Sequence, residues 1–289
     1  MLTGQQYKDS LRDGRATYFE GERIDDLPAH PLLGQTVDYT AETYDKFYNP
    51  APDAVSPLLA VPRSSDDLRA LLPLLNEAGM MAHVTSSSIQ TLKTVAGRMT
   101  DVKPEYLERM QIYIEESQKS DIRITQCITD AKGNRSKSPC AQDDPDAYVR
   151  VVSRQRDGVV IRGAKLHITG ASFGHDLMTI PTKSMKPGEE DYSVACMVPV
   201  NAEGVRIINT TYAPRHEDAR TFPISGKYHY PEGFVIFDNV FVPWEHVFIY
   251  RNIEISRDQW WKTTAHTLGN HQAQVRYVTK LRFMIGLAQ

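Results

Sequence analysis

The sequence contains few cysteines, and this limits the kinds of site it can build. Its three cysteines, Cys127, Cys140 and Cys196, are an odd number at wide spacing. Such a pattern does not indicate a disulfide framework, and a reducing cytoplasm is the expected location. A zinc site needs closely spaced Cys and His pairs. The sequence shows no such pairs, so no metal site is predicted.

Long apolar runs and an excess of positive charge are also missing. No stretch reaches the roughly 18 apolar residues that cross a bilayer, and the N-terminal sequence MLTGQQYKDSLRDGR lacks the apolar core of a signal peptide. The 33 basic and 36 acidic residues give a net charge of −3. Neither a membrane nor a nucleic acid is therefore expected as a partner. The 41% apolar and 24% charged residues are typical of an ordinary globular protein.

Helical patterns occupy the first part of the chain. Thr3 is placed to cap one helix, and Ser64 or Ser65 to cap another whose first turn is acidic. Pro73 lies inside the second pattern, where a proline breaks or kinks a helix. Helices are predicted over Gln5–Arg12, around Tyr39–Tyr48, from Ser64 or Ser65 onward, and over Pro104–Lys119.

The pattern changes after the first third of the sequence. From Tyr148 to Tyr250, short β-branched runs alternate with turn signals, which is typical of an antiparallel barrel or sandwich. Helical composition returns after Ile255. The order of helices, strands and helices predicts an α+β protein. Its expected parts are an N-terminal helical domain over 1–135, a β-barrel domain over 136–255, and the first helix of a C-terminal helical domain over 256–289.

One strand pattern, GAKLHITGAS from Gly163 to Ser172, carries polar residues at alternate positions. Alternation would place Lys165, His167 and Thr169 on one face of the strand and the apolar Leu166 and Ile168 on the other. The polar face then meets either water or a polar ligand.

A second segment, CITDAKGNRSKSP from Cys127 to Pro139, combines a Gly-Asn turn with three cations. A glycine turn beside cations suits a phosphate or an electron-rich ring system. The alternative is a solvated loop between domains. A site is expected here only if this loop lies beside GAKLHITGAS.

Taken together, several segments resemble one protein family. GAKLHITGAS is similar to the flavin-facing strand of acyl-CoA dehydrogenases, and FDNVFVPWEHVF to a closing strand of the same β-domain. With EGERIDDLPAHP, SSDDLR and TDAKGNRSKSP, they resemble the reduced-flavin-dependent 4-hydroxyphenylacetate 3-hydroxylases and the 4-hydroxybutyryl-CoA dehydratases. The resemblance implies an acyl-CoA dehydrogenase-like fold with a central antiparallel β-barrel, and with only the start of the C-terminal helical domain.

The resemblance also implies a site for FAD, supplied in reduced form by a separate flavin reductase. Thr169 is expected near the N5 and O4 edge of the flavin ring, while His167 either packs on the ring or is an ordinary histidine. The expected catalytic residues are Thr169, Gln126 and His271. The expected FAD contacts are Gln126, Cys127, Ile128, Thr129, Lys132, Gly133, Asn134, Arg135 and Thr169. The expected substrate contacts are Ser86, Gln90, Pro181 and Thr182.

The sequence departs from the family at several of these positions. The cluster ligands of the dehydratases align with Ala82, Ser86, His271 and Val278, and an iron–sulfur cluster needs thiolates, so none is expected. His271 is then either a site residue or an ordinary, partly buried histidine.

The residues that contact the phenol in the hydroxylases align with Ser86, Gln90 and Gln126. These cannot activate a phenol as a strong base would, which speaks against simple 4-hydroxyphenylacetate hydroxylation. The segment HVTSSSIQ either lines a polar pocket or caps a helix that begins near Ile89.

The function that the resemblance implies is a subunit of a two-component monooxygenase. Such an enzyme oxidises a small organic substrate through a flavin hydroperoxide in a dry pocket. One alternative is a flavin-dependent dehydratase or desaturase without a cluster, and another is a non-catalytic scaffold half of a heteromeric flavoenzyme.

An apolar stripe follows the last predicted helix, at Val275, Val278, Leu281 and Ile285. Family members continue there with a long helical domain, so the chain is a fragment, the product of a split gene, or a reduced relative. The stripe favours cover by a second polypeptide or by a homo-oligomer.

Overall fold

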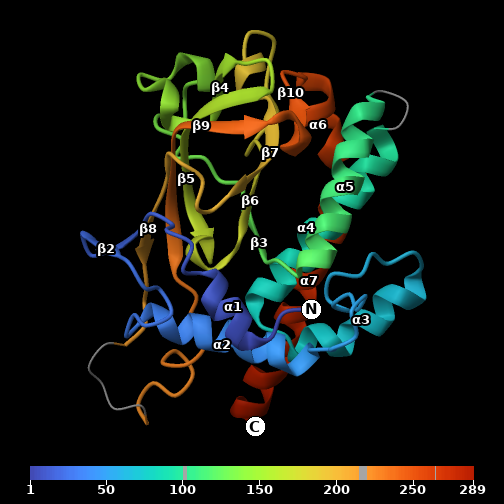
Figure 1. Cartoon of the computed structure of the whole chain (residues 1–289), viewed down its shortest axis with the longest axis vertical. Helices are drawn as coiled ribbons and strands as arrows, with labels where there is room; N and C mark the ends of the chain where they lie inside the picture. The colour runs from blue at the N-terminus through green and yellow to red at the C-terminus, as the bar shows by residue number, and fades with distance from the viewer. Residues whose placement is uncertain (100–102, 215–219, 264) are drawn as a thin grey trace.

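The computed structural model describes residues 1–99, 103–214, 220–263 and 265–289, and it places a β-domain beside a group of long helices (Figure 1). The helices are α1 (Gly4–Ser10), α2 (Leu33–Phe47), α3 (Ser65–Glu77), α4 (Met80–Met99), α5 (Pro104–Ser120), α6 (Ile253–Trp261) and α7 (Ala265–Ala288). The strands are β1 (Thr17–Phe19), β2 (Glu22–Ile24), β3 (Ile124–Cys127), β4 (Arg150–Arg154), β5 (Gly158–Thr169), β6 (Asp176–Thr179), β7 (Val194–Pro199), β8 (Val205–Thr210), β9 (Glu232–Pro243) and β10 (Val247–Tyr250). None of the helices in these ranges is long and apolar enough to cross a membrane.

Capping explains where the early helices begin. The Thr3 hydroxyl accepts a hydrogen bond from the Gln6 backbone N–H, and the Gln6 side chain accepts one from the backbone of Thr3. Ser64 forms the same reciprocal pair with Asp67 at the start of α3. Each pair satisfies N–H groups that the helix leaves without partners. The predicted caps at Thr3 and Ser64 are confirmed, and α3 continues through Pro73 to its end at Glu77.

The serine cluster does not cap a helix, so of the two alternatives for HVTSSSIQ the capping one is wrong. Helix α4 begins at Met80, and residues 86–88 lie in its middle, almost fully buried. A mid-helix serine is tolerated when its hydroxyl bonds back to the preceding turn. The Ser88 hydroxyl donates in this way to the Val84 carbonyl at 2.8 Å.

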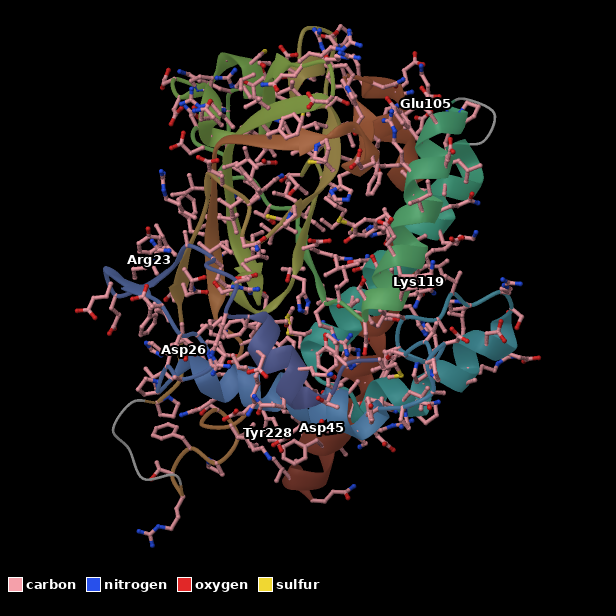
Figure 2. The ribbon with its side chains drawn as sticks, in the orientation of Figure 1. Arg23, Asp26, Asp45, Glu105, Lys119 and Tyr228 are labelled. Atoms are coloured by element: carbon pink, nitrogen blue, oxygen red, sulfur yellow. The ribbon has the colours of Figure 1, made fainter. Side chains whose placement is uncertain are left out.

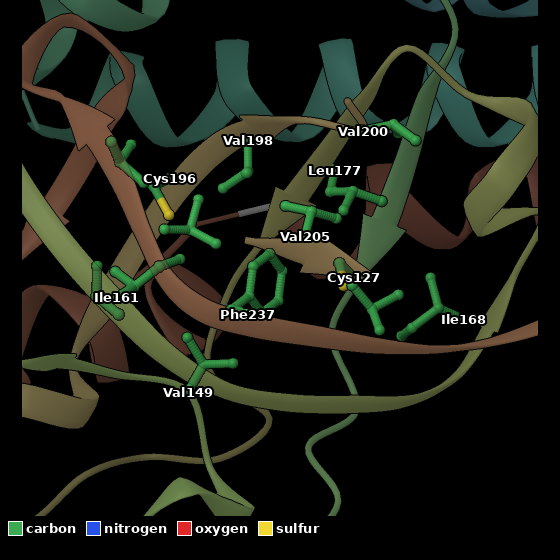
Figure 3. Close-up of a cluster of buried hydrophobic side chains, with 14 of the residues drawn as sticks. Cys127, Val149, Ile161, Ile168, Leu177, Cys196, Val198, Val200, Val205 and Phe237 are labelled. Atoms are coloured by element: carbon green, nitrogen blue, oxygen red, sulfur yellow. The ribbon is translucent and has the colours of Figure 1, made fainter. Parts of the chain in front are cut away.

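The β-domain consists of two sheets packed face to face. One has six strands in the order β2-β1-β8-β9-β5-β4, and the other has four in the order β10-β7-β6-β3. All pairs are antiparallel except β1 with β8 and β3 with β6. Apolar side chains fill the space between the sheets around Phe237 (Figure 3). The predicted α+β class is confirmed, with two open sheets where a barrel was expected. Because β1, β2 and β3 lie within residues 1–135, the domain limit at 135 stays a proposal.

A bulge in β5 changes the predicted faces of GAKLHITGAS. Lys165 pairs with Val235 and Ile168 with Gly233, so β5 carries one more residue than β9 across this stretch. His167 takes up the extra residue with a φ of 57°. Lys165 and Ile168 therefore both face the buried interior, and Thr169 faces the other way. The prediction that Lys165 and Thr169 share one face is wrong, because strict alternation does not survive a bulge.

Helix α7 is partly buried over its first part and exposed over its last turns. Ala265 is buried, and Val275 packs against a leucine cluster that includes Leu71 and Leu75 of α3. The end of α7 projects below α2 and α3 (Figure 1). Of the predicted stripe, Val278, Leu281 and Ile285 are 44%, 39% and 58% exposed.

Candidate functional site

The two polar segments of the sequence lie side by side in the fold. The Leu166 N–H donates to the Thr129 carbonyl at 2.7 Å, and the Ala131 N–H donates to the Ala164 carbonyl at 3.2 Å. The segment that follows β3 thus runs along the second half of β5. The loop that carries the Gly-Asn turn therefore lies beside GAKLHITGAS, which was the condition for expecting a site there.

A buried ion pair joins these two segments. Lys165 and Asp130 are 1% and 2% exposed, and Lys165 Nζ lies 2.8 Å from Asp130 Oδ1. Lys165 also donates to the carbonyls of Ile128 and Ile180 at 2.8 and 2.7 Å. Asp130 accepts from the Val149 N–H at 3.1 Å. The pair is therefore desolvated and well supplied with hydrogen bonds, as a buried pair must be to persist.

The predicted substrate residue Thr182 belongs to this network. Its backbone N–H and its hydroxyl lie 3.2 and 2.6 Å from Asp130 Oδ2. The neighbouring Pro181 is buried. The network therefore fixes the segment after β6 against the segment after β3.

The predicted FAD contacts lie in different environments along one segment. Cys127 points into the core between the sheets, where burial raises the pKa of its thiol to about 12. Only its backbone is left to contact a cofactor. Ile128, Thr129 and Lys132 are half-buried, and Gly133, Asn134 and Arg135 are exposed.

The turn in this segment presents cations without acidic partners. Lys132 and Gly133 have φ values of 72° and 47°, so the chain reverses there. Across the described ranges, neither Lys132 nor Arg135 forms an ion pair. Both cations remain available to a phosphate.

A neutral polar cluster lies where α4 packs on β3. Gln126 Nε2 donates to the Ser87 hydroxyl at 2.6 Å, and Gln90 Nε2 donates to the Ser86 hydroxyl at 3.1 Å. Ser86 and Gln90 are 1% and 4% exposed, and Gln90 Oε1 has no partner within the described residues. His271 is half-buried on α7, and its Nε2 likewise has no partner there.

Thr169 opens onto a cavity of about 430 Å³. Its hydroxyl donates to Glu232 Oε1 at 2.5 Å, and Glu232 Oε2 has no partner within the described part of the chain. His83 of α4 and Arg276 of α7 also line this cavity. Sequence reasoning missed these three residues. They come from distant segments; His83 begins the segment HVTSSSIQ but was not singled out within it, and no local motif marks Glu232 or Arg276.

His83 stays neutral in the fold. It is 2% exposed, and burial, with Arg276 nearby, lowers the pKa of its imidazole from 6.5 to about 4. The unfolded chain takes up this proton at a higher pH than the folded chain does. Stability from His83 is therefore fully present above about pH 6.5 and is lost as the pH falls towards 4.

We expect this loss to amount to about 3 kcal/mol at pH 4, at about 1.4 kcal/mol for each pKa unit. The measurement is urea unfolding at several pH values, comparing the chain with His83→Gln. The variant should lack this part of the pH dependence, whereas His167→Gln, at an exposed histidine, should retain it. Parallel pH profiles for the chain and for His83→Gln would refute the expectation.

A family model provides the deciding comparison. The model of the 4-hydroxyphenylacetate 3-hydroxylase N-terminal region matches residues 3–249. The chain belongs to this family.

Among relatives in the 4-hydroxyphenylacetate 3-hydroxylase family, the oxygenase component of 4-hydroxyphenylacetate 3-monooxygenase from Geobacillus sp. (strain PA-9) is 26% identical. That match covers 99% of the chain and 62% of the relative. The 4-hydroxybutyryl-CoA dehydratase/vinylacetyl-CoA-Δ-isomerase of Clostridium aminobutyricum is 27% identical over 86% of the chain and 56% of its own length. The chain thus spans about three fifths of the relatives that it matches.

Solved structures show the fold of the family. A crystal structure of the oxygenase component (HpaB) of 4-hydroxyphenylacetate 3-monooxygenase, complexed with FAD and 4-hydroxyphenylacetate, matches with a TM-score of 0.88 at 24% identity, over 100% of this chain and 63% of that one. An archaeal 4-hydroxybutyryl-CoA dehydratase from N. maritimus matches with a TM-score of 0.81 at 25% identity, over 94% and 59%. The expected acyl-CoA dehydrogenase-like fold and the family resemblance are confirmed.

The residues expected to align with the cluster ligands of the dehydratases are Ala82, Ser86, His271 and Val278. Ala82 is buried in the leucine cluster, and Val278 is exposed on α7. Throughout the residues that the structure describes, no three His, Cys, Asp or Glu side chains are grouped to bind a metal ion.

Proposed function

We propose that the chain is the flavin-binding part of a two-component, FAD-dependent monooxygenase that oxidises a small organic substrate. The observation that carries this proposal is the pairing of the 129–131 segment with β5. This pairing brings the cationic turn beside the strand that ends at Thr169. The names of the relatives support it, since several are oxygenase components, and so does the FAD in the solved HpaB complexes.

The residues present fit FAD at two places. Lys132 and Arg135 lack acidic partners within the described ranges and stand beside a turn with two positive φ values, which suits the negative phosphates. The Thr169 hydroxyl donates its hydrogen bond to Glu232, so towards a cofactor it offers only its oxygen lone pairs as acceptors. It would accept a hydrogen bond from an N–H of the flavin ring.

When bound, reduced FAD supplies the electrons that activate oxygen, and a separate reductase supplies the reduced FAD. The chain itself positions the cofactor and excludes water. The Lys165–Asp130 pair holds the two contacting segments in register, and the buried cluster around Ser86 and Gln90 offers neutral hydrogen bonds to a substrate. Such a cluster selects a polar, uncharged group better than a phenolate.

Flavin titration tests the proposal. Arg135→Ala should weaken the binding of reduced FAD about tenfold, because it removes a charge-assisted contact. Arg156→Ala, at an exposed arginine of the β4–β5 turn, is the matched control. Thr169→Val should weaken binding through loss of the acceptor. Oxygen uptake by the complex from its own host, given reduced FAD and substrate, separates oxygenase from dehydratase.

A colourless complex from the host, with no response to either variant, would instead support a scaffold.

We also propose that a second, helical polypeptide covers the end of α7. Seven large apolar side chains there are 39–71% exposed, namely Tyr277, Val278, Leu281, Phe283, Met284, Ile285 and Leu287. An exposed apolar patch of this kind marks an interaction surface. Helix α7 carries Arg276, Lys280 and Arg282 and no acidic residue, so an acidic, amphipathic helix is complementary.

Native mass spectrometry of the protein from its own host tests this cover. A hetero-oligomer that dissociates in Ile285→Glu is expected. Ile112→Glu, at an exposed isoleucine of α5, is the control. A monomer, or a homo-oligomer of this chain alone, would contradict the proposal.

A further inference from the structure

A second groove, away from Thr169, lies where the segment that leads into α3 meets α4. Its volume is about 380 Å³, and its lining comes from residues 61–65, α3, α4 and the first part of α7. None of the described residues that line it also lines the cavity beside Thr169. The groove is therefore a separate opening in the surface of the fold.

Two cations line this groove without acidic partners. Arg63 lies just before α3 and Lys93 lies on α4; both are exposed, and neither forms an ion pair within the described ranges. The acids in the first turn of α3 are outside the lining and are already engaged. Asp66 accepts a hydrogen bond from an arginine of the same helix at 2.6 Å, and Asp67 accepts from the Arg63 backbone N–H at 2.7 Å. The charged side chains that line the groove are therefore all basic, which favours an anion.

The beginning of α3 adds to this preference. The helix has 13 residues, and Ser64 and Ser65 at its N-terminal end line the groove. Aligned peptide dipoles place positive partial charge at this end of a helix. Phosphate groups bind at such ends because the dipole and the cations act on them together.

One buried acceptor in the lining has no partner. Gln90 is 4% exposed, and its Nε2 donates to the Ser86 hydroxyl at 3.1 Å, whereas its Oε1 has no partner among the described residues. A buried acceptor in this state costs free energy unless another group donates to it. Gln90 and Lys93 lie three residues apart on α4 and so share one side of the helix. A ligand held by Lys93 can therefore extend towards Gln90.

We propose that this groove receives the substrate of the proposed monooxygenase, and that this substrate is a small organic phosphate with an apolar body. Its phosphate contacts Arg63 and Lys93 beside the N-terminus of α3. Its apolar body packs against Leu68 and Leu268, which also line the groove. A neutral N–H or O–H at its other end donates to Gln90 Oε1. The inference rests on the proposed function, because Gln90 is one of its expected substrate contacts.

Three matched probes test the groove on the 289-residue chain by calorimetry without flavin. 4-Aminophenyl phosphate carries the anion and a neutral donor, phenyl phosphate lacks the donor, and 4-methoxyaniline lacks the anion. We expect 4-aminophenyl phosphate to bind about tenfold more tightly than 4-methoxyaniline, which loses the charge-assisted contacts. It should bind about fivefold more tightly than phenyl phosphate, which loses one hydrogen bond. Equal binding of the three probes, or no binding of 4-aminophenyl phosphate at millimolar concentration, would overturn the proposal.

Variants assign each end of the ligand. Lys93→Met should weaken 4-aminophenyl phosphate about fivefold and leave 4-methoxyaniline unchanged, because only the phosphate contacts this cation. Gln90→Leu should abolish the difference between 4-aminophenyl phosphate and phenyl phosphate. Lys119→Met, at an exposed lysine near the end of α5 (Figure 2), is the control and should change none of these affinities. An unchanged affinity for 4-aminophenyl phosphate in Lys93→Met would contradict the proposal.

Flavin binding and oxygen uptake separate this inference from the proposed function. A chain that binds FAD, and whose host complex takes up oxygen, but that does not bind 4-aminophenyl phosphate would refute the groove alone. A chain that binds 4-aminophenyl phosphate through Lys93 and Gln90 but has no affinity for FAD would refute the monooxygenase. The groove would then be upheld as a phosphate site but not as a substrate site.

Discussion

Replacing Lys165 with methionine should destabilise the protein by about 3–5 kcal/mol, because the substitution leaves Asp130 charged, buried and unpaired. Methionine keeps the length of the side chain, so the loss reports the charge and its hydrogen bonds more than the packing. Lys186→Met makes the same change at an exposed lysine and should alter stability by less than about 0.5 kcal/mol. Urea unfolding at pH 7 measures both.

A double variant separates the charge from the shape of this site. With Asp130→Asn added, no uncompensated charge remains, and the amide oxygen still accepts from the Val149 N–H. The double variant should therefore be more stable than Lys165→Met alone. Substitutions at distant residues have additive effects, so this non-additivity would show that Lys165 and Asp130 are energetically coupled. If the two losses simply add, the pair is not the unit that fixes these segments.

The second large effect is expected at Gly163, where Gly163→Ala should cost about 4 kcal/mol. Its φ of 135° is unfavourable for any residue with a Cβ, which accounts for about 1–3 kcal/mol. A Cβ there would also lie 2.6 Å from the Tyr148 carbonyl oxygen and from the Val149 Cα. Both are backbone atoms of the segment entering β4, so the clash adds about 1–3 kcal/mol.

Gly188→Ala isolates the conformational part of that cost. Gly188 has a φ of 93° and no atom within 4 Å of the position of a Cβ. This variant should lose about 1–2 kcal/mol from backbone strain alone. Urea unfolding of the two variants gives the difference directly. Equal losses would show that β4 moves away without cost.

The parts of the fold that could be predicted from the sequence are those decided by near neighbours. Thr3 and Ser64 were identifiable as caps because their partners lie three residues further on. The order of helices and strands followed from local periodicity in the same way. The serine cluster suggested a helix start because serine is a favoured capping residue. In the structure, these serines are buried against β3 in the middle of α4, which continues past them.

The candidate site was predictable only where a contiguous segment carries it. The Gly-Asn turn and the end of β5 were visible as motifs, but their pairing depends on tertiary contacts. The bulge at His167 depends on the register of β9 and inverts the expected place of Lys165. Glu232, His83 and Arg276 meet only through folding, so no spacing in the sequence reveals their cavity.

The parallel pairing of β1 with β8 has a consequence for synthesis on the ribosome. Thr17 pairs with Ile207, so the β1–β2 hairpin emerges long before the strand that it joins. At the usual rate of translation, roughly 10 to 40 s separate the two events. A two-stranded hairpin is marginally stable by itself. The nascent chain therefore carries an unjoined edge for most of its elongation, and it is during this interval that a chaperone would matter most.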